Sequence, residues 1–253
     1  MKWRAKYPHS LQLPTSWQQL KRGEQYCKAL DGYFKPWFGK VYGQQVLKIG
    51  GLSTELKWDS PNQHNILLYP DFPTELELPE SEIDNRTLTQ NSIIQASMTH
   101  LPFYEKAIDA CVLANTLNFA QDPHQLLREV TRVLNDDGFL FISLFNPCST
   151  LLWKQDLAKR DLKQRWLIRK YLTWRVMDWL ELLNFEIVQQ DNLVKSGKIP
   201  HFCHFSGQLA VIVARKRTIP LSLNPKKVRF KAPSFIPATA TLNRSEKSVA
   251  AEK

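Results

Sequence analysis

The stretch from Val46 to Thr54 reads V-L-K-I-G-G-L-S-T, in which apolar residues run directly into two glycines. The apolar part predicts a buried strand over residues 44–49. Gly50 and Gly51 predict a tight turn from that strand into a helix, because glycine adopts backbone angles that other residues avoid and lets a ligand approach the main chain closely. The stretch therefore predicts the first strand of an α/β domain, with a ligand site at its end.

The rest of the chain alternates between strand patterns and helix patterns. One helix is predicted over residues 16–38, where Pro36 marks its end, and another over residues 122–134, whose apolar residues fall on one side. Residues 135–138, Asn-Asp-Asp-Gly, predict a turn. The other predicted strands span residues 65–69, 92–96, 107–113, 139–143, 185–190 and 209–214, and two more helices are predicted at about 151–170 and 174–183. Strands that alternate with helices predict a doubly wound α/β fold.

The charge of the chain is unevenly distributed. Residues 1–191 carry 22 Lys and Arg against 22 Asp and Glu, whereas residues 192–253 carry 12 against 2, so the whole net charge of +10 lies in the C-terminal quarter. Residues 218–253 are rich in Pro, Ser, Thr, Asn and Ala, which predicts a disordered basic tail. Two interpretations stay open: residues 215–231 attract an anionic partner, such as nucleic acid or a membrane surface, or the tail only keeps the protein soluble.

Other patterns argue against whole classes of protein. No run of about 18 apolar residues occurs, so no transmembrane segment is predicted. The four cysteines form no C-x-x-C pair, which favours free thiols and a cytoplasmic location. They are Cys27, Cys111, Cys148 and Cys203. The cluster of His201, Cys203 and His204 lacks the four ligands that zinc needs, so no metal site is predicted.

Five short motifs follow one another through the middle of the chain. They are L-P-F at 101–103, I-D at 108–109, D-P at 122–123, R-V-L at 132–134 and N-D-D-G at 135–138, which leads into the strand at 139–143. In this order and spacing they resemble the methyltransferase type 11 domain, a class I domain that depends on S-adenosylmethionine (SAM), over roughly residues 44–190. Each motif is weak alone, but the series is specific. The strings at 47–50 and 213–225 further resemble a bacterial branch of uncharacterised proteins, the YafS-like proteins.

The resemblance implies a Rossmann-like methyltransferase fold with a mostly parallel sheet of seven strands, in which SAM lies across the carboxyl ends of the first strands. It divides the chain into a helical cap (1–43), a methyltransferase-like domain (44–217) and the tail (218–253). It implies methyl transfer to an acceptor that the sequence does not name, and it assigns no catalytic residue. The residues that it places against SAM are Gly50, Gly51, Asp71, Ser97, Met98, Leu113, Ala114 and Asn115.

The glycine motif departs from the family pattern V-L-D-x-G-x-G-x-G. Lys48 stands in place of the acid, and Leu52 and Thr54 stand in place of two glycines. Ser97 stands where the family often has an acid beside the adenine. An ammonium that pointed inward at Lys48 would cost on the order of 1–4 kcal/mol beside the cationic SAM. Three hypotheses stay open: a methyltransferase with a shifted binding mode, a catalytically inactive binding protein with the same fold, and a pocket for another, anionic nucleotide-like ligand.

The acceptor side of the site is less defined. Asn118, Asp122, His124 and His100 are candidates for a base near the predicted mouth, although Asp122 followed by proline is more simply a helix cap. Residues 151–180 interleave Trp and Tyr with Lys and Arg. That segment either covers the acceptor or binds an anionic partner, or it is a helix with one buried and one solvated face.

Overall fold

A seven-stranded sheet runs through the molecule in the order β3-β2-β1-β4-β5-β7-β6. Its strands are β1 (Gln45–Ile49), β2 (His64–Tyr69), β3 (Asn91–Gln95), β4 (Ile108–Ala114), β5 (Leu134–Phe145), β6 (Phe185–Lys195) and β7 (Gly207–Lys216). Strands β1 to β5 pair in parallel, and β7 is antiparallel to both β5 and β6. The computed structural model describes residues 13–58, 63–70, 91–147, 168–195 and 207–218, all within one compact unit, Met1–Thr218. The predicted doubly wound, mostly parallel sheet is confirmed.

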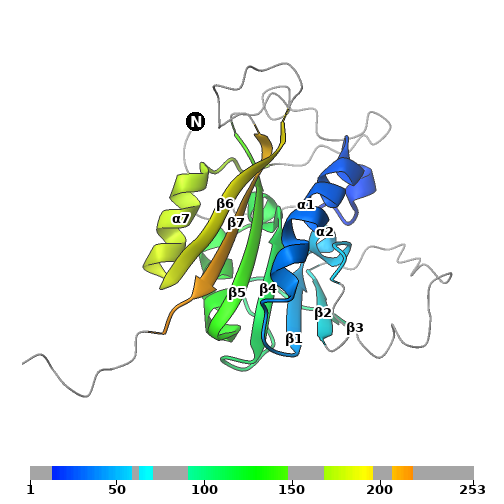
Figure 1. The fold of residues 1–253 in the computed structure, drawn as a ribbon. Helices are drawn as coiled ribbons and strands as arrows, with labels where there is room; N and C mark the ends of the chain where they lie inside the picture. Colours follow the sequence, from blue (N-terminus) through cyan, green and yellow to red (C-terminus); the bar gives the residue numbers. More distant parts are fainter. Residues whose placement is uncertain (1–12, 59–62, 71–90, 148–167, 196–206, 219–253) are drawn as a thin grey trace, which may run out of the picture. The chain divides into compact units, whose positions relative to one another are not determined.

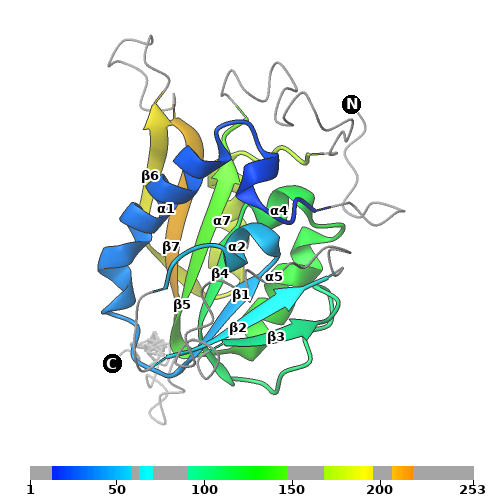
Figure 2. The ribbon, with the colours of Figure 1, turned by 90° about the vertical axis from the view of Figure 1, so that its right-hand side faces the viewer.

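Helices cover both faces of this sheet. They are the short turn η1 (Trp17–Gln19), α1 (Gly23–Phe38), α2 (Gly51–Thr54), α4 (Thr116–Phe119), α5 (Pro123–Val133) and α7 (Thr173–Leu182). One apolar cluster joins η1, α1 and α2 to one face, and a second cluster joins α5 and α7 to the other. Figures 1 and 2 show α1 on the opposite side of the strands from α7. The short helix α4 contributes Leu117 to one cluster and Phe119 to the other, at the carboxyl edge of the sheet.

The alternation of side chains along β1 shows how the sequence specifies both faces. Val46 belongs to the cluster under α1, whereas Leu47 and Ile49 belong to the cluster under α5 and α7. Successive strand residues point to opposite faces, so a central strand must be apolar on both. Phe34 of α1 meets Phe141 of β5 edge-on, with ring centroids 5.3 Å apart. Each large side chain that is buried in this way stabilises the fold by about 1.5–3 kcal/mol.

Three local predictions differ from the structure. The helix predicted over residues 16–38 is divided, because η1 ends at Gln19 and α1 begins only at Gly23, after Arg22 with a φ of 65°. Pro36 lies inside α1, which continues to Phe38; the two residues after it are the buried Trp37 and Phe38, whose packing keeps the last turn in place. The predicted turn at 135–138 falls within the range of β5, where the pairing with β4 is irregular and Asp137 has a φ of 63°. The predicted helix cap is confirmed, because the Asp122 carboxylate accepts a hydrogen bond from the Gln125 amide at 3.0 Å.

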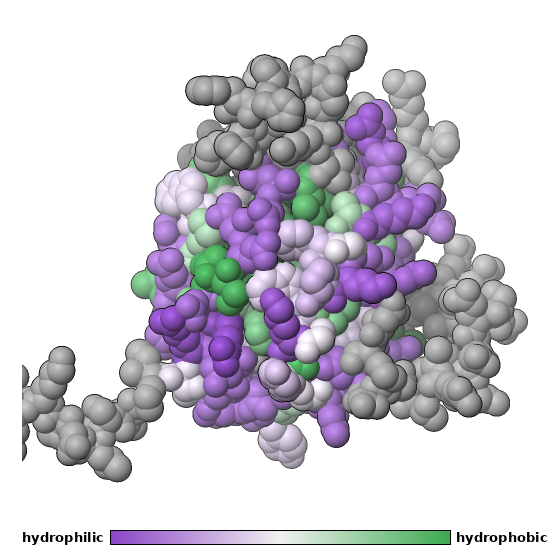
Figure 3. Space-filling model, viewed as in Figure 1, coloured by the Kyte–Doolittle hydropathy of each residue, from purple (hydrophilic) through white to green (hydrophobic). Residues whose placement is uncertain are grey.

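The face seen in Figure 3 is mostly hydrophilic, with hydrophobic side chains in small separate patches. Among the described residues, the large hydrophobic side chains exposed on any face are Tyr42, Ile93, Tyr104, Leu172, Trp174, Leu182 and Val188. None of the described helices is long and apolar enough to cross a membrane. The predicted domain limits at residues 43 and 217 stay predictions, and the tail from residue 219 and most of the segment 151–170 lie outside the described residues.

Candidate functional site

The strand order reverses direction between β1 and β4. From β1 the chain continues outward to β2 and β3 on one side, and it then returns to place β4 and β5 on the other side. In open α/β sheets, ligands bind outside the carboxyl ends of the strands at such a switch point. Gly50 follows the end of β1 and Asn115 follows the end of β4. The topology therefore locates the candidate site between these two residues.

Gly50 has backbone angles that favour glycine. Its φ is 87° and its ψ is 151°, a region that residues with a side chain rarely adopt. The Gly50 amide donates to the Leu68 oxygen at 2.9 Å, and its own oxygen accepts from the amides of Ser53 and Thr54 at 2.9 and 3.2 Å. The turn is thus bound to β2 on one side and closes directly into α2 on the other.

Two hydroxyl groups connect the ends of β1 and β4. Ser53 Oγ donates to the Ile49 oxygen at 2.7 Å and accepts from the Ala114 amide at 2.8 Å. Thr116 Oγ1 also donates to the Ile49 oxygen, at 2.8 Å. Both side chains are buried, and buried main-chain groups are costly to leave without partners. These bonds therefore hold the glycine turn at a constant position relative to Ala114.

Asn115 carries a buried hydrogen-bond donor beside this bridge. Its side chain is fully buried and its φ is 55°, a left-handed conformation that asparagine tolerates better than most residues. Its Oδ1 accepts from Ser143 Oγ at 2.7 Å. Its Nδ2 has no hydrogen-bond partner among the described residues. A buried donor without a partner costs about 1–3 kcal/mol. A ligand oxygen that accepted a hydrogen bond from Nδ2 would remove this cost, so it would gain more binding free energy than it would from a donor already bonded to water.

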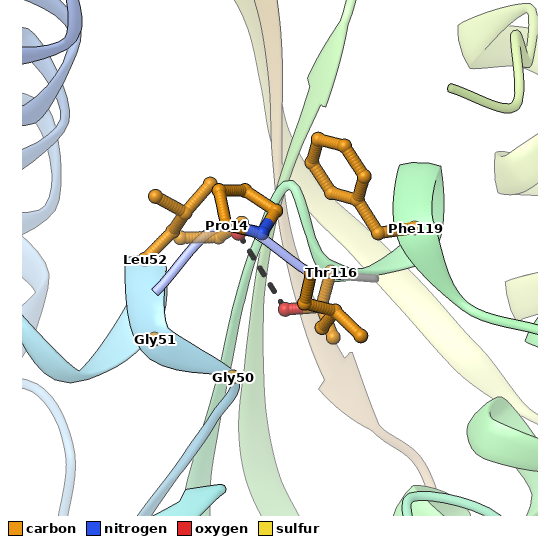
Figure 4. A pocket seen from close by; sticks show the side chains of 8 residues that line it. Pro14, Gly50, Gly51, Leu52, Thr116 and Phe119 are labelled. Carbon is orange, nitrogen blue, oxygen red and sulfur yellow. Dashed lines mark hydrogen bonds between the residues drawn. The ribbon is translucent and has the colours of Figure 1, made fainter. Parts of the chain in front are cut away.

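A small hollow lies over the glycine turn, too tight to admit a water-sized sphere. It is lined by Leu13, Pro14, Gly50, Gly51, Leu52, Ala114, Thr116 and Phe119. Figure 4 shows Pro14 and Leu52 on one side of it, and Thr116 and Phe119, from the chain after β4, on the other. Ordinary ligand pockets hold about 300–1,000 Å³. The hollow is therefore only part of the space that a SAM-sized ligand needs.

Lys48 does not point at the glycine turn. Its side chain is 4% exposed, and its ammonium donates to the Leu56 oxygen at 2.7 Å. Leu56 lies just beyond the carboxyl end of α2, whereas Gly50 lies at its amino end. A cation is favourable near the carboxyl end of a helix, where carbonyl groups lack partners. The Lys48 ammonium therefore does not face the glycine turn, and no repulsion between it and the positive charge of SAM is expected.

The other two departures from the glycine pattern also serve contacts within the chain. Leu52 is buried, and its oxygen accepts from the indole Nε1 of Trp17 at 2.8 Å. Thr54 Oγ1 donates to the Gly51 oxygen at 2.7 Å and lies 2.8 Å from the hydroxyl of Tyr69, at the end of β2. Burial raises the pKa of Tyr69, so this hydroxyl stays protonated and can donate. The Leu52 side chain therefore adds packing around α2, and the Thr54 hydroxyl adds hydrogen bonds, whereas the bond from Trp17 uses a main-chain oxygen that glycine would also supply.

The structure brings together some of the predicted SAM contacts. Gly50, Gly51 and Ala114 line one hollow, and the buried Leu113 and Asn115 adjoin Ala114 in the chain. Ser97 and Met98 lie in the turn after β3, at the same edge of the sheet. Ser97 is exposed and bonded to Thr99, and Met98 packs against the core. Asp71 lies outside the described residues. For all eight, contact with SAM stays a prediction.

Sequence reasoning missed the residues that cover the turn. Leu13 and Pro14 lie more than 30 residues before it, and no periodic pattern marks them. The sequence does hold a signal for Thr116, because a hydroxyl residue that soon follows the end of a central strand is well placed to bond a neighbouring strand. Its bond to the Ile49 oxygen still depends on the β1–β4 pairing, which the sequence of either strand alone does not specify.

The candidate bases on the acceptor side already have structural roles. Asn118 donates from Nδ2 to the Arg169 oxygen at 2.7 Å and accepts from the Phe145 amide at 3.0 Å. The His124 ring lies 4.1 Å from the ring of Trp179, and burial lowers the pKa of His124, which favours the neutral form. His100 is exposed. In the described part of the chain no three His, Cys, Asp or Glu residues gather as metal ligands, and residues 201–204 lie outside it.

Comparison with known proteins agrees with this geometry. Residues 65–142 match the family described as a methyltransferase domain. A relative named uncharacterized protein YafS, from Escherichia coli (strain K12), is 36% identical over 254 residues, which cover 96% of this chain and 98% of the relative. The chain belongs to the YafS family. It carries a methyltransferase domain, as the ordered motifs between residues 101 and 143 predicted.

Solved structures show the same fold at low sequence identity. A SAM-dependent methyltransferase of Thermotoga maritima, described as a possible histamine N-methyltransferase, has a TM-score of 0.52 and 17% identity and covers 76% of this chain and 89% of its own. A SAM-dependent methyltransferase of Aquifex aeolicus has a TM-score of 0.51 and 15% identity, with coverage of 76% and 92%. The cyclase SpnF has a TM-score of 0.53 and 14% identity, with coverage of 85% and 89%. A cyclase among these neighbours shows that the fold alone does not specify the reaction.

Proposed function

We propose that this chain is a SAM-dependent methyltransferase that acts on an acceptor still to be identified. The observation that carries the proposal is the Gly50 turn at the β1–β4 switch point, where a positive φ turns the main chain from β1 directly into α2 at the carboxyl edge of the sheet. The methyltransferase domain at residues 65–142 supports it. The direction of Lys48 supports it further, because its ammonium bonds Leu56 and leaves the turn without a like charge.

The residues at this edge fit SAM in kind. The main chain at Gly50 and Gly51 would hold the methionine half, and the main-chain oxygens of Leu113 and Ala114 would accept from its ammonium group. Asn115 Nδ2, which has no described partner, would donate to a carboxylate oxygen of the ligand. Ser97, exposed after β3, would accept one hydrogen bond from the adenine. Asp71 would bond the ribose.

Bound SAM supplies a methyl group on a sulfonium, which is a good leaving group, so the chain's own residues have mainly to bind and orient the two reactants. The Ser53 and Thr116 bridge does this by holding Ala114 against the glycine turn. Burial lowers the pKa of His124 and favours its neutral form, which would be able to accept a proton from a weakly nucleophilic acceptor.

A second candidate, a binding protein that has lost catalysis, is favoured by one observation. The Leu52 side chain is buried in the core, the Thr54 hydroxyl contacts Tyr69, and the hollow over the turn is small. Of the residues proposed for an anionic partner, the described ones at 215–217 already have contacts within the chain. Arg215 and Arg217 pair with Asp137 and Glu186. The Lys216 ammonium donates to two main-chain oxygens at the end of α5, both at 2.7 Å.

We place the protein in the cytoplasm under either of the two proposed functions.

Calorimetric titration with SAM and with S-adenosylhomocysteine tests the proposal. We expect saturable one-to-one binding at micromolar strength. A matched pair of variants locates the adenine: Ser97→Asp should tighten binding severalfold, while His100→Asp, in the same turn, should leave it unchanged. Absence of heat at millimolar ligand, from protein shown to be folded, would reject the methyltransferase and favour the binding protein.

A further inference from the structure

Residues 13–17, here called the strap, lie directly on the glycine turn. A Cβ atom built on Gly51 would lie 2.3 Å from the Thr15 oxygen and 2.6 Å from the Thr15 Cα. Gly51 is the first residue of α2 and has an ordinary helical backbone. Glycine is therefore required at position 51 by the close approach of the strap, and not by backbone angles. The strap and the turn fit each other at main-chain distance.

The carboxyl end of the strap is anchored in the core. Trp17 is 1% exposed, and its indole donates to the Leu52 oxygen at 2.8 Å. The Trp17 amide donates to Glu55 Oε2 at 3.2 Å. Its ring also meets Tyr26 of α1 edge-on. Because a buried Trp contributes much of its large apolar area to stability, this end is the fixed end of the strap.

The middle of the strap is held by a weaker contact, while Leu13 at its amino end packs against the apolar cluster under α1. The Thr15 amide donates to Gln19 Oε1 at 3.1 Å, and Gln19 Nε2 donates back to Thr15 Oγ1 at 2.8 Å. Both residues are only partly buried. Exposed hydrogen bonds of this kind exchange with water at small net cost. The Thr15–Gln19 pair is therefore the part of the strap that is easiest to open.

From this arrangement we infer that the strap is a lid over the cofactor turn, hinged at Trp17 and latched by the Thr15–Gln19 pair. The inference rests on the proposed function. Leu13 and Pro14 line the hollow over the turn and leave it no room for a water-sized sphere, whereas the smallest ordinary ligand pocket holds about 300 Å³. The strap must move before SAM reaches Gly50 and Gly51. The apparent Kd then equals the intrinsic Kd divided by the fraction of molecules with an open strap.

A matched pair of glutamines tests the latch. Gln19→Ala removes both bonds to Thr15, whereas Gln18→Ala, at the exposed neighbouring position, removes neither. In the full-length protein, SAM binding is measured by calorimetry and by stopped flow, and strap opening by hydrogen exchange at residues 13–17. We expect Gln19→Ala to speed exchange, to raise the association rate and to lower the apparent Kd by about threefold to tenfold. Gln18→Ala should match the parent protein.

Trp17→Phe is the second variant, which keeps an aromatic ring and loses the bond to Leu52. If SAM binds the parent, Gln19→Ala and Trp17→Phe equally well and equally fast, the strap is not a lid. If Gln19→Ala speeds exchange in the strap without a change in SAM binding, the lid is likewise rejected. If SAM binds none of the three while exchange shows an open strap, the proposed function itself is rejected. The two failures are thus separate results.

Discussion

The ammonium of Lys48 donates to the main-chain oxygen of Leu56 at 2.7 Å, across the carboxyl end of α2. Lys48 occupies the position where the related methyltransferases have an acid, so its charge was the strongest argument against SAM binding. The alternation of β1 places it on the same face as Val46, the face that α2 covers. The side chain extends along α2 to its far end and satisfies a carbonyl there. The substitution thus alters how α2 is held more than it alters the charge at the glycine turn.

Lys48→Met should therefore destabilise the fold and leave the affinity for SAM nearly unchanged. The variant leaves the Leu56 oxygen without its donor, which should lower the free energy of unfolding by about 1–3 kcal/mol. SAM affinity should stay within about twofold of the parent. Denaturant unfolding and calorimetric titration measure the two quantities. An affinity gain of tenfold or more would mean that the ammonium does face the ligand, contrary to this structure.

Ser53→Ala should weaken the bridge between β1 and β4. The Ala114 amide would lose its acceptor in a fully buried place, so we expect a loss of about 1–3 kcal/mol in unfolding free energy and weaker SAM binding. Ser16→Ala is the comparison for stability alone, because Ser16 Oγ, as the N-cap of η1, also accepts a main-chain N–H, but at an exposed site where water partly replaces it. Equal effects of the two variants would show that the bridge has no special role.

His124 should make stability depend on pH. Burial lowers its pKa below the ordinary 6.5, helped by Arg128, Arg169 and Arg175 and opposed by Asp122. The unfolded chain then binds the proton more tightly than the folded chain, so the contribution of neutral His124 is full above about pH 6.5 and is lost as the pH falls through the lower folded pKa. Denaturant midpoints between about pH 5 and 8 should fall less steeply toward acid in His124→Gln than in the parent. An unchanged slope would contradict the assignment.

The strands were the most predictable part of the fold. The largely apolar run of β4, broken only by Asp109, predicted residues 107–113, and the strand spans Ile108–Ala114, because only a strand buried on both faces needs such a run. The end of α1 was less predictable. Proline usually stops a helix, but Pro36 lies close enough to the end that the burial of Trp37 and Phe38 outweighs the missing donor.

The position of the candidate site was predictable from the sequence, but the residues that cover it were not. The residue type of Gly50 alone predicts the turn, and in the structure Gly50 has a φ of 87°, which glycine permits. The approach of Thr15 to Gly51 joins residues 36 positions apart, and the bond from Trp17 to Leu52 joins residues 35 apart. The local spacing of apolar residues does not predict contacts between residues so far apart in the sequence. The sequence predicts Gly51 as a ligand contact, which stays a prediction, and the structure adds that the main chain of Thr15 lies against it.

A pair of glycine substitutions separates these two explanations. Gly51→Ala places a Cβ against the Thr15 oxygen, a distance that main chain cannot accept without moving, so unfolding free energy should fall by about 1–3 kcal/mol. Gly32→Ala is the control, because Gly32 is exposed inside α1 and a Cβ added there would have no atom within 4 Å. There alanine should stabilise the helix by about 0.5–1 kcal/mol. Thermal or denaturant unfolding measures both variants, and hydrogen exchange should show residues 13–17 less protected in Gly51→Ala alone. If Gly51→Ala were as stable as the parent, with the strap still protected, the close approach of Thr15 would not exist in solution, and position 51 would again be explained by the ligand.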